Sequence, residues 1–139
     1  MTAMNWLFKE EPSNYNFDAL VKDKSTVWSG VRNPVAQRNL HAVKKGDRVF
    51  FYHTGDEKQI VGIGEVIRES FSDPTAAKDE AWVAVTTVAD KPLPKPVTLA
   101  TIKAEAKLKD MALVKYGRLS VQPVTDAEWK LVCKMAGLE

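Results

Sequence analysis

Cysteine and histidine are scarce in this sequence, since its 139 residues include one cysteine and two histidines. The single cysteine, Cys133, cannot form an internal disulfide. It also lies far along the chain from His41 and His53, so no group of residues has the spacing of a metal site. We therefore expect no bound metal and no cofactor. A chain without disulfides suits a reducing compartment, and we expect a cytoplasmic protein.

Long apolar runs are also missing. No segment approaches the ~20 apolar residues of a membrane-spanning helix. Met1–Trp6 lacks the basic region and the following apolar region of a signal peptide. The sequence has no phosphate-binding loop, no dinucleotide glycine fingerprint and no nucleophile elbow. We expect a protein that does not bind membranes and is not an enzyme.

A strong excess of one charge is absent as well. The net charge is +2 at pH 7, which alone does not indicate nucleic-acid binding, although a local basic patch matters more than the total. Hydrophobic residues make up 45% of the chain and charged residues 27%, a composition typical of globular proteins. At this length we predict that residues 1–139 form one domain.

Five segments rich in apolar and β-branched residues predict strands. They are Trp6–Phe8, Val49–His53, Gln59–Ser70, Trp82–Val88 and Arg118–Gln122. In the third segment, Ile63 and Ile67 fall on one face while Gly62 and Gly64 fall on the other. Paired glycines inside a strand indicate a bend or a close backbone approach, which suits a small, strongly curled barrel. The proline-rich segment Lys91–Pro96 is predicted to be a loop.

Helix start signals lie between these strands. Asn16 and Asn33 are predicted N-caps of short helices over residues 17–24 and 34–43. A further short helix is predicted over residues 99–106. Short helices between about five strands do not build a parallel doubly wound sheet. We therefore predict an α+β, barrel-like domain.

The C-terminal region predicts an amphipathic helix. Thr125 and Glu128 have the spacing of a capping box. The apolar residues that follow at helical spacing are Trp129, Val132, Cys133 and Ala136. Trp129 is therefore expected in the core.

Polar and aromatic residues gather where the predicted elements end. Trp28–Asn33 combines a large aromatic ring, a glycine, an arginine and an amide beside a helix start, where an anion or the polar edge of a ring can bind. Similar clusters are Lys9–Pro12, Tyr52–Thr54 and Arg118–Ser120. Each cluster alone is better explained by core packing or by solvated charge. Together they mark positions that one barrel would bring to a single pocket.

Five motifs in one order make this sequence resemble the EVE domain family. They are Trp6–Pro12, Trp28–Asn33, Gly46–Asp47 with Phe51–Thr54, Val61–Val66, and Arg118–Val121, and they span essentially the whole chain. The resemblance implies a PUA-like fold, a curled mixed β-barrel of about five to six strands with short peripheral helices. It also implies a bacterial cytoplasmic or nucleoid-associated protein that binds a modified base of DNA or RNA without chemistry.

The resemblance further implies a pocket that holds one base, with aromatic rings for stacking and polar groups that read the base edge. Trp28 and Tyr52 are the expected walls, and Trp28 is expected to contribute more to binding than to folding. The expected base- or ligand-binding residues are Lys9, Trp28, Val31, Arg32, Asn33, Tyr52, His53, Thr54, Arg118, Leu119 and Ser120.

Two other functions stay open. A hydrolase or transferase would use His53 with Glu10 or Glu65, and it would need a carboxylate and a nucleophile within hydrogen-bond reach of the imidazole. A protein-interaction module would need a large exposed apolar patch. The sequence leaves open the choice between DNA and RNA, the modification that is read, and the oligomeric state, with a monomer favoured.

Overall fold

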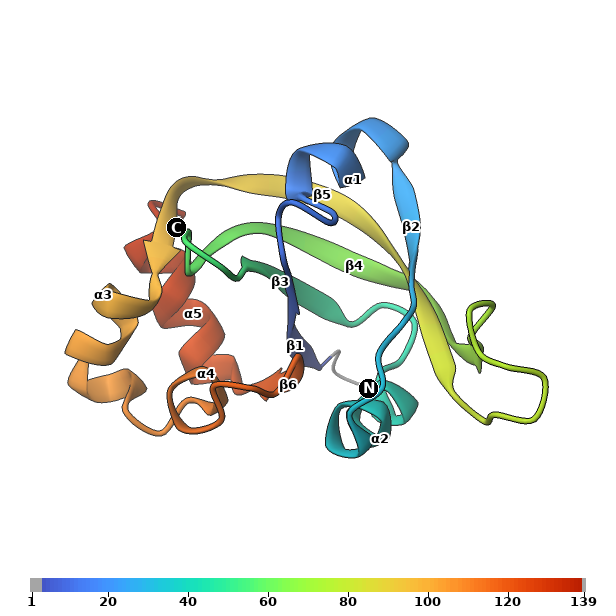
Figure 1. Ribbon diagram of the computed structural model, residues 1–139. Coiled ribbons are helices and arrows are strands. Elements are labelled where there is room, and N and C mark those ends of the chain that lie inside the picture. Colours follow the sequence, from blue (N-terminus) through green and yellow to red (C-terminus); the bar gives the residue numbers. More distant parts are fainter. Residues whose placement is uncertain (1–3, 139) are drawn as a thin grey trace.

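The computed structural model describes residues 4–138, which form one six-stranded mixed sheet in the order β2-β5-β4-β3-β1-β6. The strands are β1 (Asn5–Glu10), β2 (Ser25–Trp28), β3 (Arg48–His53), β4 (Gln59–Ser72), β5 (Val83–Thr98) and β6 (Val121–Val124). β1 and β3 run parallel, and all other neighbours run antiparallel. The sheet is strongly curved, but its edges β2 and β6 do not pair (Figure 1). The α+β fold and the strand number are confirmed, whereas closure of the barrel is not found.

Short helices surround the sheet. They are α1 (Phe17–Asp23), α2 (Pro34–Ala42), α3 (Leu99–Ala104), α4 (Ala112–Lys115) and α5 (Asp126–Met135), with a 3-10 turn, η1 (Ala106–Leu108), after α3. The predicted caps are confirmed: Asn16 and Asn33 accept bonds from first-turn amides, and Thr125 with Glu128 forms the capping box. Figure 1 places α3, α4 and α5 together, apart from α1 and α2. No helix among the described residues has the length and apolarity to cross a membrane.

The sheet separates two hydrophobic cores, because successive side chains of a strand point to opposite faces. Leu7 and Phe50 enter the core beneath α3, α4 and α5, whereas Phe8 and Phe51 enter the core beneath α1 and α2. On the first side Trp129 stacks on Phe50, with ring centroids 3.7 Å apart. Trp129 is 4% exposed, so its predicted place in the core is confirmed.

The two glycines of β4 permit close packing. A side chain at Gly62 would collide with the ring of Phe17 on α1, and one at Gly64 would collide with a ring on β3. The close approach predicted for this strand is therefore confirmed. Val66 is buried in the core beneath α1 and α2, whereas Ile67 is 40% exposed. The register between β4 and β5 shifts between Val66 and Arg68, which makes Ile67 the extra residue of a β-bulge.

Two predicted strand boundaries are wrong, and both errors involve proline. Lys91–Pro96 is part of β5, not a loop. β2 pairs with β5 only as far as Val88. The residues of β5 after Val88 have no neighbouring strand on that side, so a proline there, which lacks an N–H, costs no hydrogen bond between strands. Pro123 lies inside β6, which is itself an edge strand. β6 begins at Val121, so Arg118–Ser120 precede the strand and do not share one strand face.

Candidate functional site

A pocket opens where the parallel strands β1 and β3 end. The last residues of these strands, Glu10 and His53, lie opposite each other in the register. α1 and β2 supply the remaining walls. The outer part of the pocket has a volume of about 200 Å³ and is lined by Glu10, Tyr15, Thr26, Val27, Trp28 and Ser29.

The inner part of the pocket is a narrow recess. Its floor consists of the buried side chains of Phe17, Leu20 and Phe51. The volume that the centre of a water-sized sphere can occupy in the recess is about 10 Å³. The recess therefore has room for one water molecule. Glu10, Tyr15 and Trp28 line both parts, so the recess adjoins the outer part of the pocket.

His53 fixes the start of α1 beside the pocket. The backbone N–H of Phe17 donates to Nε2 of His53 (3.1 Å), and Nδ1 lies 2.8 Å from Oε1 of Glu57. Because Nε2 accepts a hydrogen bond, Nδ1 carries the proton and donates to Glu57. This hydrogen bond lowers the pKa of the Glu57 carboxyl. Both ring nitrogens of His53 are thus engaged in holding structure.

The same geometry does not supply the catalytic pair that a hydrolase or transferase would require. The carboxylate beside His53 is Glu57, neither Glu10 nor Glu65. A backbone amide occupies Nε2, where a catalytic pair would place a nucleophile. Glu65 of β4 lies opposite Arg48 in the strand register, at the other end of β3 from His53. His53 is therefore a positioning residue for α1 and a wall of the pocket.

Lys9 lies beside Tyr52, a residue of the recess whose side chain packs in the core beneath α3, α4 and α5. The Lys9 ammonium donates to the carbonyl of Gly117 (2.6 Å) and lies 5.5 Å from the centroid of the Tyr52 ring. Burial lowers the pKa of Lys9 and raises the pKa of the Tyr52 hydroxyl. The backbone N–H of Lys9 also donates to the carbonyl of Ser120 (2.9 Å), so the turn that contains Arg118 runs next to β1.

Trp28 is a core residue as well as a pocket wall. It is 8% exposed, and its ring centroid lies 5.4 Å from that of Phe8 and 5.5 Å from that of Phe51. Trp28 ends β2, a strand absent from the sequence-based prediction, and pairs there with Val85. This packing indicates that Trp28 also stabilises the fold. Its expected larger contribution to binding than to folding stays a prediction.

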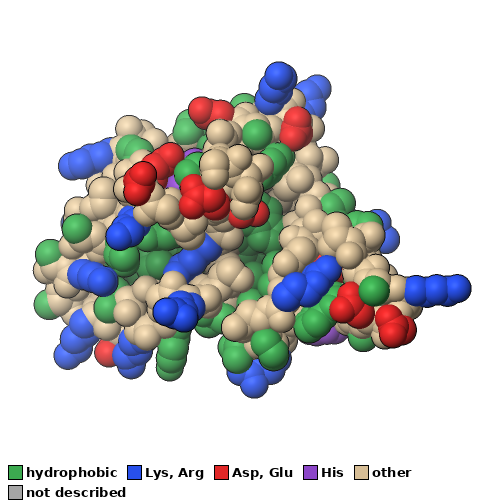
Figure 2. Space-filling model, in the orientation of Figure 1, with side chains coloured by type: hydrophobic (Ala, Val, Ile, Leu, Met, Phe, Trp, Pro, Cys, Tyr) green, Lys and Arg blue, Asp and Glu red, His purple; other side chains and the backbone are tan. Residues whose placement is uncertain are grey.

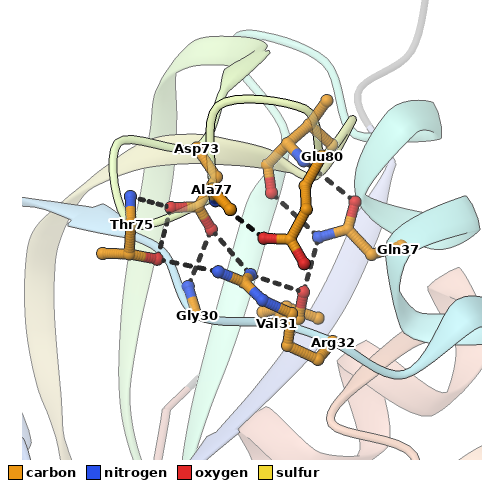
Figure 3. Close-up of polar contacts among 9 residues, drawn as sticks. Gly30, Val31, Arg32, Gln37, Asp73, Thr75, Ala77 and Glu80 are labelled. Carbon is orange, nitrogen blue, oxygen red and sulfur yellow. Dashed lines mark hydrogen bonds and ion pairs between the residues drawn. The ribbon is translucent and has the colours of Figure 1, made fainter.

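Arg32 belongs to a polar network with the segment that follows β4 (Figure 3). Its guanidinium donates to Asp73 Oδ2 (3.1 Å) and to Thr75 Oγ1 (3.0 Å), and the N–H of Gly30 donates to the same carboxylate oxygen (2.8 Å). Burial acts to raise the pKa of Asp73, but the hydrogen bonds from Thr75, Gly30 and Arg32 outweigh it and hold that pKa at about 2. Gly30 has φ +80°, a conformation that favours glycine.

Three further predicted residues have structural contacts. Val31 is buried, and its carbonyl accepts a hydrogen bond from Gln37 Nε2 (2.7 Å). Asn33 caps α2 through two backbone amides. Thr54 Oγ1 lies 3.5 Å from Glu11 Oε2, just beyond the end of β3.

The structure brings together only part of the predicted site. The predicted residues that line the pocket are Trp28, Tyr52 and His53. Arg32 and Arg118 are not among its lining residues. The pocket also contains residues that the prediction missed, among them the polar residues Glu10, Tyr15 and Ser29. The parallel pairing of β1 with β3 would have indicated Glu10, whereas nothing in the sequence singles out Tyr15.

The comparison with known proteins identifies the class first. The sequence profile of the EVE domain matches residues 4–135, so the chain belongs to the EVE domain family, and its neighbours have the expected PUA-like fold. Protein Rpa0253 from Rhodopseudomonas palustris is 53% identical, with a TM-score of 0.91 over 97% of this chain and 94% of that chain. Thymocyte nuclear protein 1 from Homo sapiens is 27% identical in an alignment of 166 positions that covers 96% of this chain and 74% of that protein. The structure of human THYN1 protein in complex with 5-methylcytosine containing DNA is 27% identical, with a TM-score of 0.89 over 99% of each chain.

Proposed function

We propose that this EVE domain binds nucleic acid and reads a modified base without performing chemistry, with 5-methylcytosine in DNA as the first candidate. The observation that carries the proposal is the pocket at the ends of β1 and β3, which joins aromatic walls, polar groups and an apolar recess. A related human protein of the same fold was solved with 5-methylcytosine containing DNA. The engaged nitrogens of His53 favour binding over catalysis.

The outer pocket suits one planar ring. Its volume of about 200 Å³ lies below the roughly 300–1,000 Å³ of most small-molecule sites. Tyr15 and Trp28 offer aromatic surface to a base that has left the stack. Glu10 supplies a carboxylate, the acceptor that suits the exocyclic amino group of cytosine. Ser29 adds a hydroxyl beside it.

The recess suits a methyl group. It is floored by Phe17, Leu20 and Phe51 and has room for one small group. A methyl group on the base ring would gain apolar burial there, whereas a plain ring would leave the recess unfilled. Burial of one such group contributes about 0.8 kcal/mol, which is roughly a fourfold preference.

The test is a titration of the full chain with two single-stranded oligodeoxynucleotides that differ only in one 5-methyl group. We expect about fourfold tighter binding of the methylated strand. Single nucleosides, 5-methyldeoxycytidine and deoxycytidine, should show the same order with weaker affinity, because phosphate contacts are lost. Equal affinities for both members of each pair would contradict base reading through this recess.

Glu10→Gln tests the polar edge of the pocket. Hydrogen bonds to charged groups contribute about 1.5–3 kcal/mol, so loss of the carboxylate should weaken binding of the methylated strand by roughly tenfold to a hundredfold. Glu65→Gln is the matched control, because it removes the same charge from an exposed position at the opposite end of β3. Melting temperatures of both variants show whether Glu10, which accepts a bond from the N–H of Glu11 (2.9 Å), also supports the fold. Equal losses in both variants would argue against a specific contact.

A further inference from the structure

A second groove lies between α2 and the segment that joins α4 to β6. Its volume is about 520 Å³. Its lining contains one charged side chain, that of Arg38, and no carboxylate. The full lining is Asn33, Val35, Arg38, Asn39, Ala112, Tyr116, Leu119 and Pro123.

The walls of this groove are tied together by hydrogen bonds. Asn39 of α2 donates through Nδ2 to the carbonyl of Val121 in β6 (2.7 Å). The buried amide of Gln122 donates to the carbonyls of Tyr116 (3.0 Å) and Leu119 (2.9 Å), which fixes the turn between them. The groove is therefore built before any ligand arrives, and a ligand need not order it.

The groove presents groups that suit a nucleic-acid strand. Tyr116 is 59% exposed, so its aromatic ring is accessible to a ligand. Arg38 is exposed, as is Arg118 in the turn between Tyr116 and Leu119. Within residues 4–138 neither arginine forms an ion pair. Two uncompensated cations beside an exposed aromatic ring match phosphates beside a base.

Two segments of the chain link the groove to the neighbourhood of the base pocket. Ser29 lines the pocket and Asn33, four residues later, lines the groove. On the other side, Lys9 of β1 holds the carbonyl of Gly117, which directly follows Tyr116. Figure 2 shows a hollow at the centre of this face, with hydrophobic side chains on its floor, basic side chains in it and below it, and acidic side chains above it.

We propose that this groove holds the nucleic-acid strand that flanks the base in the pocket. Arg38 and Arg118 contact the phosphates, and Tyr116 stacks on a neighbouring base. This inference rests on the proposed function, because the base held in the pocket sets the direction in which the strand runs. The contacts that the groove makes with the strand do not depend on any base modification.

Another basic groove provides a matched control. It lies against α5, has a volume of about 530 Å³, and contains Lys130 and Lys134. Arg48, which also lines it, stands at the start of β3, the end opposite the base pocket. A carboxylate, Asp90, is part of its lining. With Lys91 the lining includes four cations, so the α5 groove is at least as basic as the first groove, but it lies toward the end of β3 opposite the pocket.

The experiment compares the double variants Arg38→Gln/Arg118→Gln and Lys130→Gln/Lys134→Gln, which lose the same charge. Binding of an unmodified single-stranded oligodeoxynucleotide is measured as a function of salt. We expect the first variant to lower the magnitude of the log–log salt slope by about 1.4, since each contact on a single strand contributes about 0.7. The second variant should retain the wild-type slope. Equal changes in both variants, a change in the second alone, or no binding by the wild type would each overturn the proposal.

Tyr116 supplies an independent readout. Tyr116→Ala should weaken oligonucleotide binding by roughly tenfold to a hundredfold, whereas Tyr116→Phe keeps the ring and should retain affinity. Binding of the nucleoside 5-methyldeoxycytidine should be the same in both variants, because it uses only the pocket. An equal loss of nucleoside binding in Tyr116→Ala would overturn the groove assignment. If the nucleoside does not bind the wild type but the oligonucleotide effects persist, base reading fails and the groove stands.

Discussion

At the scale of single residues, Trp28 joins the fold to the candidate site. Its ring packs between Phe8 and Phe51 in the core beneath α1 and α2, and it also lines the pocket. Trp28→Ala and Trp129→Ala should therefore both reduce the free energy of unfolding by about 3–5 kcal/mol. Thermal or denaturant unfolding measures this loss.

Binding separates the two tryptophans. Trp28→Phe keeps an aromatic ring in the core but presents a smaller face, so binding of the methylated oligonucleotide should fall while the protein remains folded. Trp129→Phe lies on the other face of the sheet and should leave binding unchanged. If both phenylalanine variants bind like the wild type, Trp28 has a purely structural role.

Asp73 gives a pH-dependent prediction at the same scale. Its pKa is about 2 in the folded protein, below the ordinary value of 3.8, because hydrogen bonds favour the carboxylate. A lowered folded-state pKa contributes stability that is complete above about pH 4 and is lost as the pH falls toward 2. Asp73→Asn should therefore cost about 2 kcal/mol of unfolding free energy at pH 7, and the difference from the wild type should shrink below pH 4.

The matched control for Asp73 is Asp79→Asn, which changes an exposed aspartate on the same loop between β4 and β5. Its unfolding free energy should stay close to that of the wild type at every pH. A constant difference between Asp73→Asn and the wild type from pH 7 to pH 2 would show that the carboxylate charge is not the stabilising feature.

At the scale of elements, local sequence signals predicted the limits of a helix correctly where its own side chains set those limits. Asn16, Asn33 and Thr125 each cap the helix that they were predicted to cap, because an N-cap contact joins residues two or three apart. Strand limits depend on partners distant in the sequence. β2 was missed because its pairing with β5 defines it. β5 tolerates its prolines because the pairing with β2 reaches only to Val88, opposite Ser25 at the start of β2.

The same difference explains the candidate site. Tyr52 and His53 were predictable because they end an apolar strand, and both line the pocket. Arg32 looked equally suitable in the sequence, but its partner Asp73 lies 41 residues away and could not be inferred. Glu10 enters the pocket only through the parallel pairing of β1 with β3. Composition and local pattern thus indicate which residue types are available, whereas long-range pairing decides which of them meet.

At the scale of the whole molecule, the charge balance limits how strongly salt controls binding. The chain has 20 basic and 18 acidic residues. Figure 2 shows side chains of both signs on the face in view, with acidic side chains gathered above the central hollow. Such a surface can neutralise only a few phosphates, those that reach Arg38, Arg118 and the neighbourhood of Lys9. With about three or four contacts, the log–log salt slope on a single strand should lie near −2 to −3. A titration of the wild type at several salt concentrations measures this slope. A value near −10 would require about fourteen contacts, and hence a broad basic surface that the balanced charges of this chain do not provide.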